Sequence, residues 1–381
     1  MKYNMVIPLN GKGQRMIDGG YTTPKPILKA GHKTILEWGI DSIDTSNCQM
    51  YFITRRDQPE VRAFINKRWP EAITLIAERD GKGSLSDVVL VAGPWINNDT
   101  PLIIFNPDVA FDKFTPQDHH FDDGTILTFK SNSPLYSYAR EEDGWVVETA
   151  EKKVISEHAT VGLCTFRSGK WLIEHFPQSV PLANGEHYVA PIYNQLIKSG
   201  GKIKKYGVQK MYVMGTPEEY EFFVKHIYPT TRHDRPFILC SDHSGYEQKE
   251  LIKSVLEEMK ISHGDVGCFD TKDCDYAEFI KGAVLHLPEF FGIACCRSGQ
   301  GVNICANKSD KEAVCCVIHT PGNYVEDTRL AIEHNCANIL ALGSRCYFSK
   351  EDIREIIKTI RSCSFDGGRH QVRMMKSLGY I

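Results

Sequence analysis

The stretch FGIACCRSGQGVNICANK, residues 291–308, places an apolar run ending in Cys295 and Cys296 directly before a loop with Ser298, Gly299 and Gly301. Cysteine is among the most often buried residue types, so a buried strand that happens to contain sulfur is the first interpretation. Neighbours on a strand point to opposite faces, which predicts that Cys295 faces the core. Whether Cys296 faces a ligand has to be inferred from the rest of the sequence.

The same order of apolar run, loop and helix recurs on both sides of this stretch. FILCS (237–241) comes before a segment whose apolar residues have helical spacing, and a second amphipathic helix is predicted around 353–360. AVCCVI (313–318) and NILALGS (338–344) are further strand candidates. The pattern predicts a doubly wound α/β domain, in which ligands bind at the carboxyl ends of the strands.

Unusual polar residues follow these predicted strands, at the edge where such a sheet binds ligands. They are Asp242 and His243, then Cys296 and Ser298, then Arg345, with His334, Arg369 and Arg373 completing the set. The last two arginines are four residues apart, so on a helix they share a face and can bind one phosphate. A thiol base, a histidine acid/base and a cluster of phosphate binders predict aldose–ketose isomerisation of a phosphorylated sugar through an enediolate.

Residues 237–378 resemble the ribose-5-phosphate isomerase B family, which also includes the subunits of galactose-6-phosphate isomerase. The motifs that carry the resemblance, in the family's order, are SDHSGYEQKE, DVGCFDT, DYAEF, GIACCRSGQGVNICANK, EHNCANILALGSR and FDGGRHQVR. The resemblance implies an active site between two subunits, and therefore a homodimer or homotetramer.

The resemblance also implies a role for each residue of the set. Cys296 would be the base that forms the enediolate, Ser298 would lie beside the substrate, and His334 would open the sugar ring. Asp242 and Tyr276 would contact hydroxyl groups of the sugar. The residues implied to hold the phosphate are His243, Arg345, Arg369 and Arg373.

The first half of the chain begins with an apolar run, YNMVIPL (3–9), followed by the glycine loop NGKGQR (10–15). Further apolar runs alternate with helix-like segments, which predicts an α/β domain with a mostly parallel sheet. A glycine loop after the first strand offers backbone N–H groups to a phosphate, and Arg15 and Lys25 are close enough in sequence to add charge. Asp108, after LIIFN, offers a carboxylate for Mg²⁺ between nucleotide phosphates.

Residues 3–225 resemble the sugar-phosphate nucleotidyltransferases, especially the capsule-type and the alditol- or heptose-linked members. The motifs are IPLNGKGQRM, TTPKPIL, LIIFNPDVAFD, TVGLCTF, GEHYVAPIYNQLIKSGGKI and MGTPEEYEFF. The resemblance implies that the triphosphate is held by Gly11, Gly13 and Arg15, with Lys25 on a phosphate, Asp108 on Mg²⁺, and Glu186 and Lys202 near the sugar-phosphate site. Many members carry an aspartate as a second metal ligand where this chain has Val213.

Length and composition limit the alternatives. The 381 residues exceed what one hydrophobic core usually serves, and the proline-containing stretch YPTTRHDRP (228–236) divides the chain into predicted domains 1–232 and 236–381. A formal charge of −3 makes nucleic acid an unexpected partner. Without a visible signal segment or a membrane-length apolar run, we expect no membrane association and a cytoplasmic location. Thirteen cysteines with no CxxC pair are expected to be reduced thiols.

The sequence therefore predicts two doubly wound, Rossmann-like three-layer α/β domains: an N-terminal nucleotidyltransferase sheet and a C-terminal parallel isomerase sheet. The predicted function is a bifunctional sugar-activation enzyme for capsule or surface polysaccharide precursors. Its partners would be an NTP with a sugar or alditol phosphate in the first domain, with Mg²⁺, and a pentose or hexose phosphate in the second, without a cofactor. Val213 motivates an alternative, a phosphosugar isomerase whose N-terminal domain binds nucleotide for regulation without catalysis.

Overall fold

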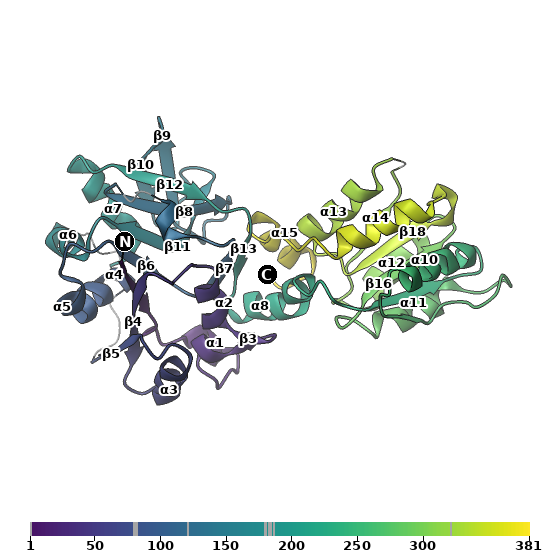
Figure 1. The fold of residues 1–381 in the computed structure, drawn as a ribbon, viewed down its shortest axis with the longest axis horizontal. Helices are drawn as coiled ribbons and strands as arrows, with labels where there is room; N and C mark the ends of the chain where they lie inside the picture. Colours follow the sequence, from purple (N-terminus) through teal and green to yellow (C-terminus); the bar gives the residue numbers. More distant parts are fainter. Residues whose placement is uncertain are drawn as a thin grey trace. The chain divides into compact units, whose positions relative to one another are not determined.

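The computed structural model describes residues 2–78, 83–119, 122–178, 181, 185, 187–320 and 322–381. The chain divides into two units, Met1–Tyr220 and Glu221–Ile381 (Figure 1). This division lies before the stretch 228–236, because Phe222 and His226 pack against Tyr380 of the second unit. The helical segments there are α8 (Pro217–Phe222), η5 (Phe223–Ile227) and α9 (Tyr228–Thr230).

The main sheet of unit 1 has nine strands within the described residues, and its parallel part positions the site. In the order β10-β9-β11-β6-β1-β4-β5, the strands β6, β1, β4 and β5 pair in parallel. Strand β11 pairs antiparallel with β6, β8 and β9, so the sheet is mixed and the expectation of a mostly parallel sheet was wrong for this half. The strands are β1 (Tyr3–Pro8), β4 (Cys48–Arg55), β5 (Ile73–Ala77), β6 (Leu102–Phe105), β8 (Gly124–Lys130), β9 (Tyr138–Glu142), β10 (Trp145–Ala150), β11 (His158–Phe166) and β12 (Ile203–Gly207).

A two-residue hairpin explains part of the antiparallel pairing. Asp143 and Gly144 join β9 to β10 with φ values of 50° and 81°. Positive φ at both central residues is the signature of a type I′ turn, for which an Asp-Gly pair is favoured. The Asp-Gly pair in EEDGW is therefore the local signal for this reversal of the chain.

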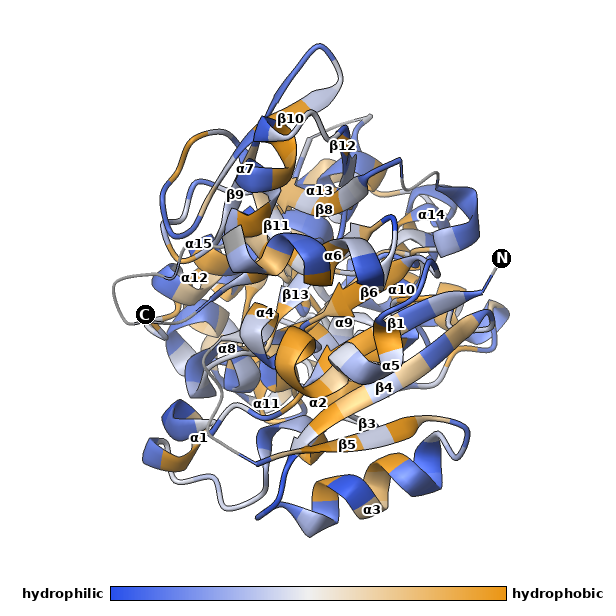
Figure 2. Ribbon diagram, turned by 90° about the vertical axis from the view of Figure 1, so that its left-hand side faces the viewer, coloured by the Kyte–Doolittle hydropathy of each residue, from blue (hydrophilic) through white to orange (hydrophobic). Residues whose placement is uncertain are grey.

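Helices cover both faces of the unit 1 sheet, which gives three layers. Along β1 the side chains of Met5 and Ile7 enter a core with α2 and α3, while Val6 enters the opposite core. Figure 2 shows hydrophobic residues along the central strands β4 and β6. The helices are α1 (Gln14–Asp18), η1 (Lys25–Ile27), α2 (Ile35–Asp41), α3 (Pro59–Arg68), α4 (Ser84–Asp87), η2 (Val88–Ala92), α5 (Gly93–Ile96), η3 (Pro116–Asp118), α6 (Gly169–His175), η4 (Phe176–Gln178) and α7 (Val189–Lys198). Two small antiparallel pairs lie apart from this sheet: β2 (Lys29–Ala30) with β3 (Lys33–Thr34), and β7 (Val109–Phe111) with β13 (Met211–Val213).

Unit 2 has a parallel sheet of five strands within the described residues, in the order β15-β14-β16-β18-β17. The chain runs outward from β14 to β15 and then crosses back to β16, so the strand order reverses between β14 and β16. Such a reversal is the place where open α/β sheets bind ligands. The strands are β14 (Phe237–Ser241), β15 (His263–Asp265), β16 (Phe291–Cys296), β17 (Cys315–Ile318) and β18 (Ile339–Gly343).

Two hydrophobic cores hold the three layers of unit 2 together. Ile293 and Cys295 of β16 enter a core with α10, α13 and α14, whereas Ala294 and Cys296 enter a core with α11 and α12. The prediction that Cys295 faces the core is confirmed, and both predicted amphipathic helices are present as α10 and α14. The helices are α10 (Tyr246–Glu258), α11 (Tyr276–Val284), α12 (Gln300–Ser309), α13 (Tyr324–Asn335), η6 (Ser344–Cys346), α14 (Lys350–Ile360) and α15 (Arg369–Ser377).

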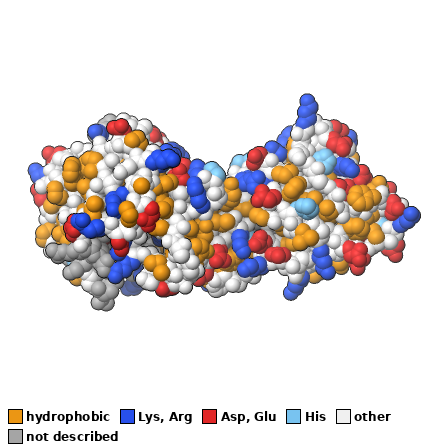
Figure 3. All heavy atoms as spheres, turned by 90° about the horizontal axis from the view of Figure 1, so that it is seen from below, with side chains coloured by type: hydrophobic (Ala, Val, Ile, Leu, Met, Phe, Trp, Pro, Cys, Tyr) orange, Lys and Arg blue, Asp and Glu red, His pale blue; other side chains and the backbone are white. Residues whose placement is uncertain are grey.

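The surface carries charges of both signs. Figure 3 shows Lys and Arg side chains interspersed with Asp and Glu side chains on the face that it presents. In the part of the chain that the structure describes, no helix combines the length and the apolar character that a bilayer crossing requires.

Candidate functional sites

A pocket of about 1060 Å³ opens at the carboxyl ends of β1 and β6 in unit 1. Gly11, Gly13 and Arg15 of the predicted glycine loop line this pocket, and so do Lys25 and Asp108. Gly13 precedes α1 with φ at 65°, a left-handed conformation that glycine adopts without steric cost. The structure thus brings all five residues to one cavity.

Lys25 and Asp108 form an ion pair inside this pocket. The Nζ atom of Lys25 lies 2.9 Å from Oδ2 of Asp108, and it also donates to the carbonyl oxygen of Gly215 at 3.5 Å. Because both side chains are partly open to solvent, the pair contributes at most about 1 kcal/mol to stability. Its importance is that it puts a cation and a carboxylate side by side on the pocket wall.

Glu219 is a carboxylate that sequence reasoning missed. Its Oε2 atom accepts hydrogen bonds from the backbone N–H groups of Gly215 at 2.9 Å and Thr216 at 3.0 Å. Burial, reinforced by the nearby charge of Asp108, raises the pKa of Glu219 to about 7. A Cβ atom at Gly215 would lie 3.2 Å from carboxylate oxygens of both Asp108 and Glu219, so the turn sits between the two acids. The Thr-x-x-Glu spacing of a helix cap was the available signal.

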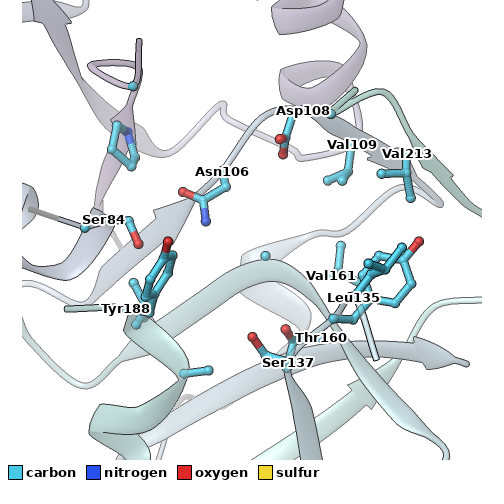
Figure 4. A pocket seen from close by; sticks show the side chains of 18 of the residues that line it. Ser84, Asn106, Asp108, Val109, Leu135, Ser137, Thr160, Val161, Tyr188 and Val213 are labelled. Carbon is cyan, nitrogen blue, oxygen red and sulfur yellow. The ribbon is translucent and has the colours of Figure 1, made fainter. Parts of the chain in front are cut away.

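The other predicted residues of unit 1 are placed differently. Val213 is buried in β13 opposite Val109, so the pocket wall is apolar at this position (Figure 4). Lys202 does not line the pocket, and its ammonium group lies 5.5 Å from the centre of the Trp145 ring. Glu186 lies outside the described residues.

Two buried polar atoms on the pocket wall have no hydrogen-bond partner within the described residues: Nδ2 of Asn10 and Oγ of Ser84. An unpaired buried polar atom costs about 1–3 kcal/mol, which a ligand that supplies the missing partner can recover. Figure 4 shows Ser84 near the same end of the pocket as Asn106 and Tyr188, with Asp108 and Val213 at the other end. The end of the pocket at Ser84 is therefore polar, whereas the end at Asp108 and Val213 has a charged side chain beside an apolar one.

No three His, Cys, Asp or Glu side chains are arranged to hold a metal ion anywhere in the described ranges. This does not conflict with Mg²⁺, which proteins commonly bind through one or two carboxylates while the remaining ligands are water and substrate phosphates. Asp108 supplies one such carboxylate at the pocket wall.

In unit 2, Cys296 ends β16 and its sulfur faces the start of α12. The backbone N–H of Gly299 donates to Sγ of Cys296 at 3.2 Å. Gly299 is the residue before α12 and has φ at 77°, a left-handed conformation in which the chain turns into the helix directly after this contact. Burial raises the pKa of the neighbouring Cys295 thiol, which faces the other core.

Ser298 and Tyr276 lie beside the same loop. The hydroxyl of Ser298 accepts from the N–H of Gln300 at 3.3 Å. A Cβ atom at Gly301 would lie 2.8 Å from the Tyr276 ring and 3.1 Å from its hydroxyl oxygen, so this ring packs on the first turn of α12.

Asp242 and His243 follow β14 on the neighbouring strand. Oδ1 of Asp242 accepts from the Ser244 hydroxyl at 2.7 Å and from the Gly245 N–H at 2.9 Å. Nδ1 of His243 lies 3.2 Å from the backbone nitrogen of Cys274 and 3.3 Å from Oδ1 of Asp273, so both neighbours come from the loop before α11.

Close backbone contacts hold these loops together. A Cβ atom at Gly245 would lie 2.4 Å from the carbonyl group of Cys295, and one at Gly343 would lie 2.8 Å from backbone carbon of Ser298. The N–H of Arg345 donates to the carbonyl oxygen of Arg297 at 3.2 Å. The loops after β14, β16 and β18 are therefore packed side by side at the edge where the strand order reverses.

His334, Arg369 and Arg373 form a second group, on α13 and α15. The His334 ring stacks on His370, with centroids 4.2 Å apart and planes 10° apart. None of the hydrogen bonds, ion pairs or ring contacts of the described residues joins this group to Cys296. Sequence reasoning assigned nothing to His370, because its partner is 36 positions away in the chain.

Comparisons with known proteins agree with this division. Residues 237–377 match the model of the Ribose/Galactose Isomerase family. A relative from Rickettsia bellii is 36% identical over 143 residues, which are 36% of this chain and 94% of the relative. Ribose-5-phosphate isomerase B of Mycolicibacterium paratuberculosis is 32% identical over 140 residues, which are 36% of this chain and 85% of that protein.

The first half is similar to a solved structure. The crystal structure of the nucleoside-diphosphate-sugar pyrophosphorylase from Vibrio cholerae RC9 has 25% sequence identity and a TM-score of 0.51, and the match covers 58% of this chain and 99% of that one. The chain therefore belongs to the ribose/galactose isomerase family through residues 237–377, and it carries before them a domain with a sugar-nucleotidyltransferase fold.

Proposed function

We propose that unit 2 interconverts an aldose phosphate and a ketose phosphate, with ribose 5-phosphate and ribulose 5-phosphate as the substrate pair. The observation that carries the proposal is the Cys296 sulfur facing the N–H of Gly299 where the strand order reverses. The Cys296 thiolate removes the proton from C2 of the open-chain aldose. The electron pair forms a C1–C2 double bond, and O1 becomes the enediolate oxygen.

The O2 hydroxyl next passes its proton to O1, and the hydroxyl of Ser298, in the loop after Cys296, can carry this proton. The Cys296 thiol then returns its proton to C1, the electron pair of the C1–C2 double bond forms the new C1–H bond, and C2–O2 becomes the carbonyl of the ketose. His334 opens the sugar ring by moving a proton to the ring oxygen. Asp242 and Tyr276 bind sugar hydroxyls, while the phosphate is held by His243, Arg345, Arg369 and Arg373.

The test is a coupled assay of ribose 5-phosphate conversion with the native chain, Cys296→Ala and Cys305→Ala. Cys305 is a partly exposed thiol on α12, so it is the matched control. We expect Cys296→Ala to lose about 10²–10⁴-fold in kcat, the range for a positioned base, and Cys305→Ala to keep the native rate. A native chain without turnover would reject ribose 5-phosphate as substrate, and an active Cys296→Ala would reject the thiol base.

For unit 1 we propose nucleotidyl transfer, in which a sugar or alditol phosphate attacks the α-phosphorus of an NTP and displaces pyrophosphate. The glycine loop, Arg15 and Lys25 bind the phosphates, and the unpaired Nδ2 of Asn10 is available to a ligand. Asp108 would hold Mg²⁺ together with nucleotide phosphate oxygens, and the ion would neutralise charge on the phosphates. Glu186 remains a proposed contact of the sugar phosphate, whereas Lys202 lies outside the lining of the pocket and is not assigned to it.

A second candidate, a nucleotide-binding regulatory unit without turnover, is favoured by Val213. Pyrophosphate release, measured with each common NTP and a panel of sugar and alditol phosphates, separates the two. Release with any pair supports transfer. Nucleotide that binds and changes the isomerase rate without any release supports regulation.

Because both proposed activities belong to one chain, we expect them to act in the same biosynthetic route. We propose that the isomerase supplies a phosphosugar whose later product is activated as a nucleotide sugar or nucleotide alditol for surface polysaccharide. Two units that accept unrelated carbon skeletons would contradict this proposal.

A further inference from the structure

The His334–His370 pair is not explained by any role assigned so far. The two rings lie nearly parallel, and each comes from a different helix, α13 and α15. His370 takes part in no step of the proposed isomerisation.

The segment FDGGRH (365–370) places His370 against the His334 ring. The N–H of Asp366 donates to the carbonyl oxygen of Glu333 at 2.9 Å, which ties the segment to the residue before His334. Gly367 and Gly368 follow with φ values of 68° and 54°, conformations that favour glycine. The chain then enters α15 at Arg369, and His370 is the second residue of that helix.

Burial and charged neighbours keep the His370 ring neutral, with its proton on one nitrogen. Nε of Arg369 donates to Nε2 of His370 at 3.3 Å, so the proton of the neutral ring lies on Nδ1. Burial, then His334, Arg369 and Arg373, lower the pKa of His370 to about 4. A neutral ring can stack on His334 whether that ring is neutral or protonated, whereas two protonated rings would repel each other.

The nitrogens of His334 are left open by this arrangement. Within the described residues, neither of its ring nitrogens has a hydrogen bond to the protein. The face of the ring is held by His370 while its edges stay available. Histidines that move protons are more often oriented through a hydrogen bond to the second nitrogen.

We propose that His370 is a positioning residue of the isomerase, which orients the His334 imidazole by stacking on its face and holds Arg369 through Nε2. The inference rests on the proposed function, in which His334 opens the sugar ring. The stack sets the direction of the His334 nitrogens, and the Arg369 contact sets the place of a phosphate ligand.

The experiment compares the full-length native protein with His370→Ala, His370→Phe and His286→Ala. The alanine removes both the stack and the acceptor, while the phenylalanine keeps a flat ring and removes only the acceptor. His286 is an exposed histidine after α11 that contacts Phe290, so its alanine variant is the control.

Ribose 5-phosphate kinetics should separate kcat from KM. A misdirected catalytic group costs about 10–10²-fold in rate, so we expect a fall of that size in kcat for His370→Ala. His370→Phe should keep kcat within about threefold and raise KM, because Arg369 has lost its partner. His286→Ala should keep both constants. A native kcat in His370→Ala, or a kcat as low in His370→Phe as in the alanine variant, overturns the proposal.

Nitrogen-15 NMR of the histidine rings tests the pair without relying on turnover. We expect His370 to stay neutral with its proton on Nδ1 from pH 5.5 to 8, and the His334 signals to move in His370→Ala and much less in His286→Ala. A His370 that titrates like a free histidine overturns the proposal. If the native chain does not isomerise ribose 5-phosphate but the NMR result holds, the substrate assignment fails and the ring pair stands.

Discussion

Cys295 and Cys296 are chemically alike and adjacent, yet their surroundings differ because a strand alternates its faces. Cys295 enters a core where burial raises its pKa, whereas the sulfur of Cys296 receives the N–H of Gly299. The N–H belongs to the residue at which the chain turns into α12 with a positive φ, so the contact lies at a conformation that favours glycine.

Replacement of Gly299 by alanine tests this contact. The residue would be strained at φ +77°, and its Cβ would lie 3.1 Å from Val317. We expect a loss of about 1–2 kcal/mol in the free energy of unfolding, measured by urea, and a lower isomerase kcat. Gly379→Ala is the matched control, because Gly379 has φ +74° with nothing within 4 Å of its Cβ. The control should lose stability without losing kcat; equal kcat in both variants would mean that the N–H direction is unimportant.

The predicted residues of the site and those that were missed differ in how far apart their partners are. Cys296, Ser298 and Gly299 are neighbours in one loop, so a short motif contains their chemistry. Glu219 gains its raised pKa partly from Asp108, and His370 gains its partner from another helix. Such relations exist only after the fold brings distant segments together.

At the scale of elements, helices with clear apolar spacing were predictable, and α10 and α14 are confirmed. The parallel strands of unit 2 also followed from the alternation of strand and helix. The antiparallel strand β11 did not, because its apolar run looks the same whichever direction its neighbours take. The start of unit 2 at Glu221 was likewise invisible, because it depends on packing of η5 against the end of the chain.

The contact of η5 with the C-terminal segment predicts a pH dependence. Burial of His226, whose Nε2 faces the Tyr380 hydroxyl at 3.2 Å, lowers its pKa from 6.5 to about 4. Between these values the unfolded chain binds a proton that the folded chain does not, so stability falls as the pH drops from 6.5 towards 4, by up to about 1.4 kcal/mol per pH unit.

Thermal unfolding of the native chain and His226→Phe between pH 4.5 and 7.5 measures how much His226 contributes to the pH dependence of stability. The phenylalanine keeps a ring against Phe222 and cannot titrate. We expect the stability of the variant relative to the native chain to rise as the pH falls below 6.5. A constant difference across the range would show that His226 binds its proton equally in both states.

At the scale of the whole molecule, unit 2 holds its site residues in two groups, one around Cys296 and one around His334. We propose that a second copy of the chain completes each site, in a homodimer or larger even assembly. Two variants that are inactive alone, Cys296→Ala and His334→Ala, would then restore each other when co-expressed.

Random pairing of the two variant chains fixes the fraction of native activity that is restored. Random pairing in a dimer makes half of the molecules mixed, and each mixed dimer contains one intact site of two, so activity should reach about a quarter of the native value. The readout is ribose 5-phosphate turnover, with light scattering to confirm the dimer. An inactive mixture in which mixed dimers have formed would place Cys296 and His334 of one site on the same chain.

The central claim is that one chain carries two separate active sites, and a crossed assay tests it most directly. Isomerisation and pyrophosphate release are measured in parallel on the native chain, Cys296→Ala and Asp108→Asn. We expect Cys296→Ala to lose isomerisation and keep pyrophosphate release, and Asp108→Asn to show the reverse, with each loss about 10²-fold or more. A native chain that lacks either reaction, or a single substitution that abolishes both in a folded protein, would contradict the account.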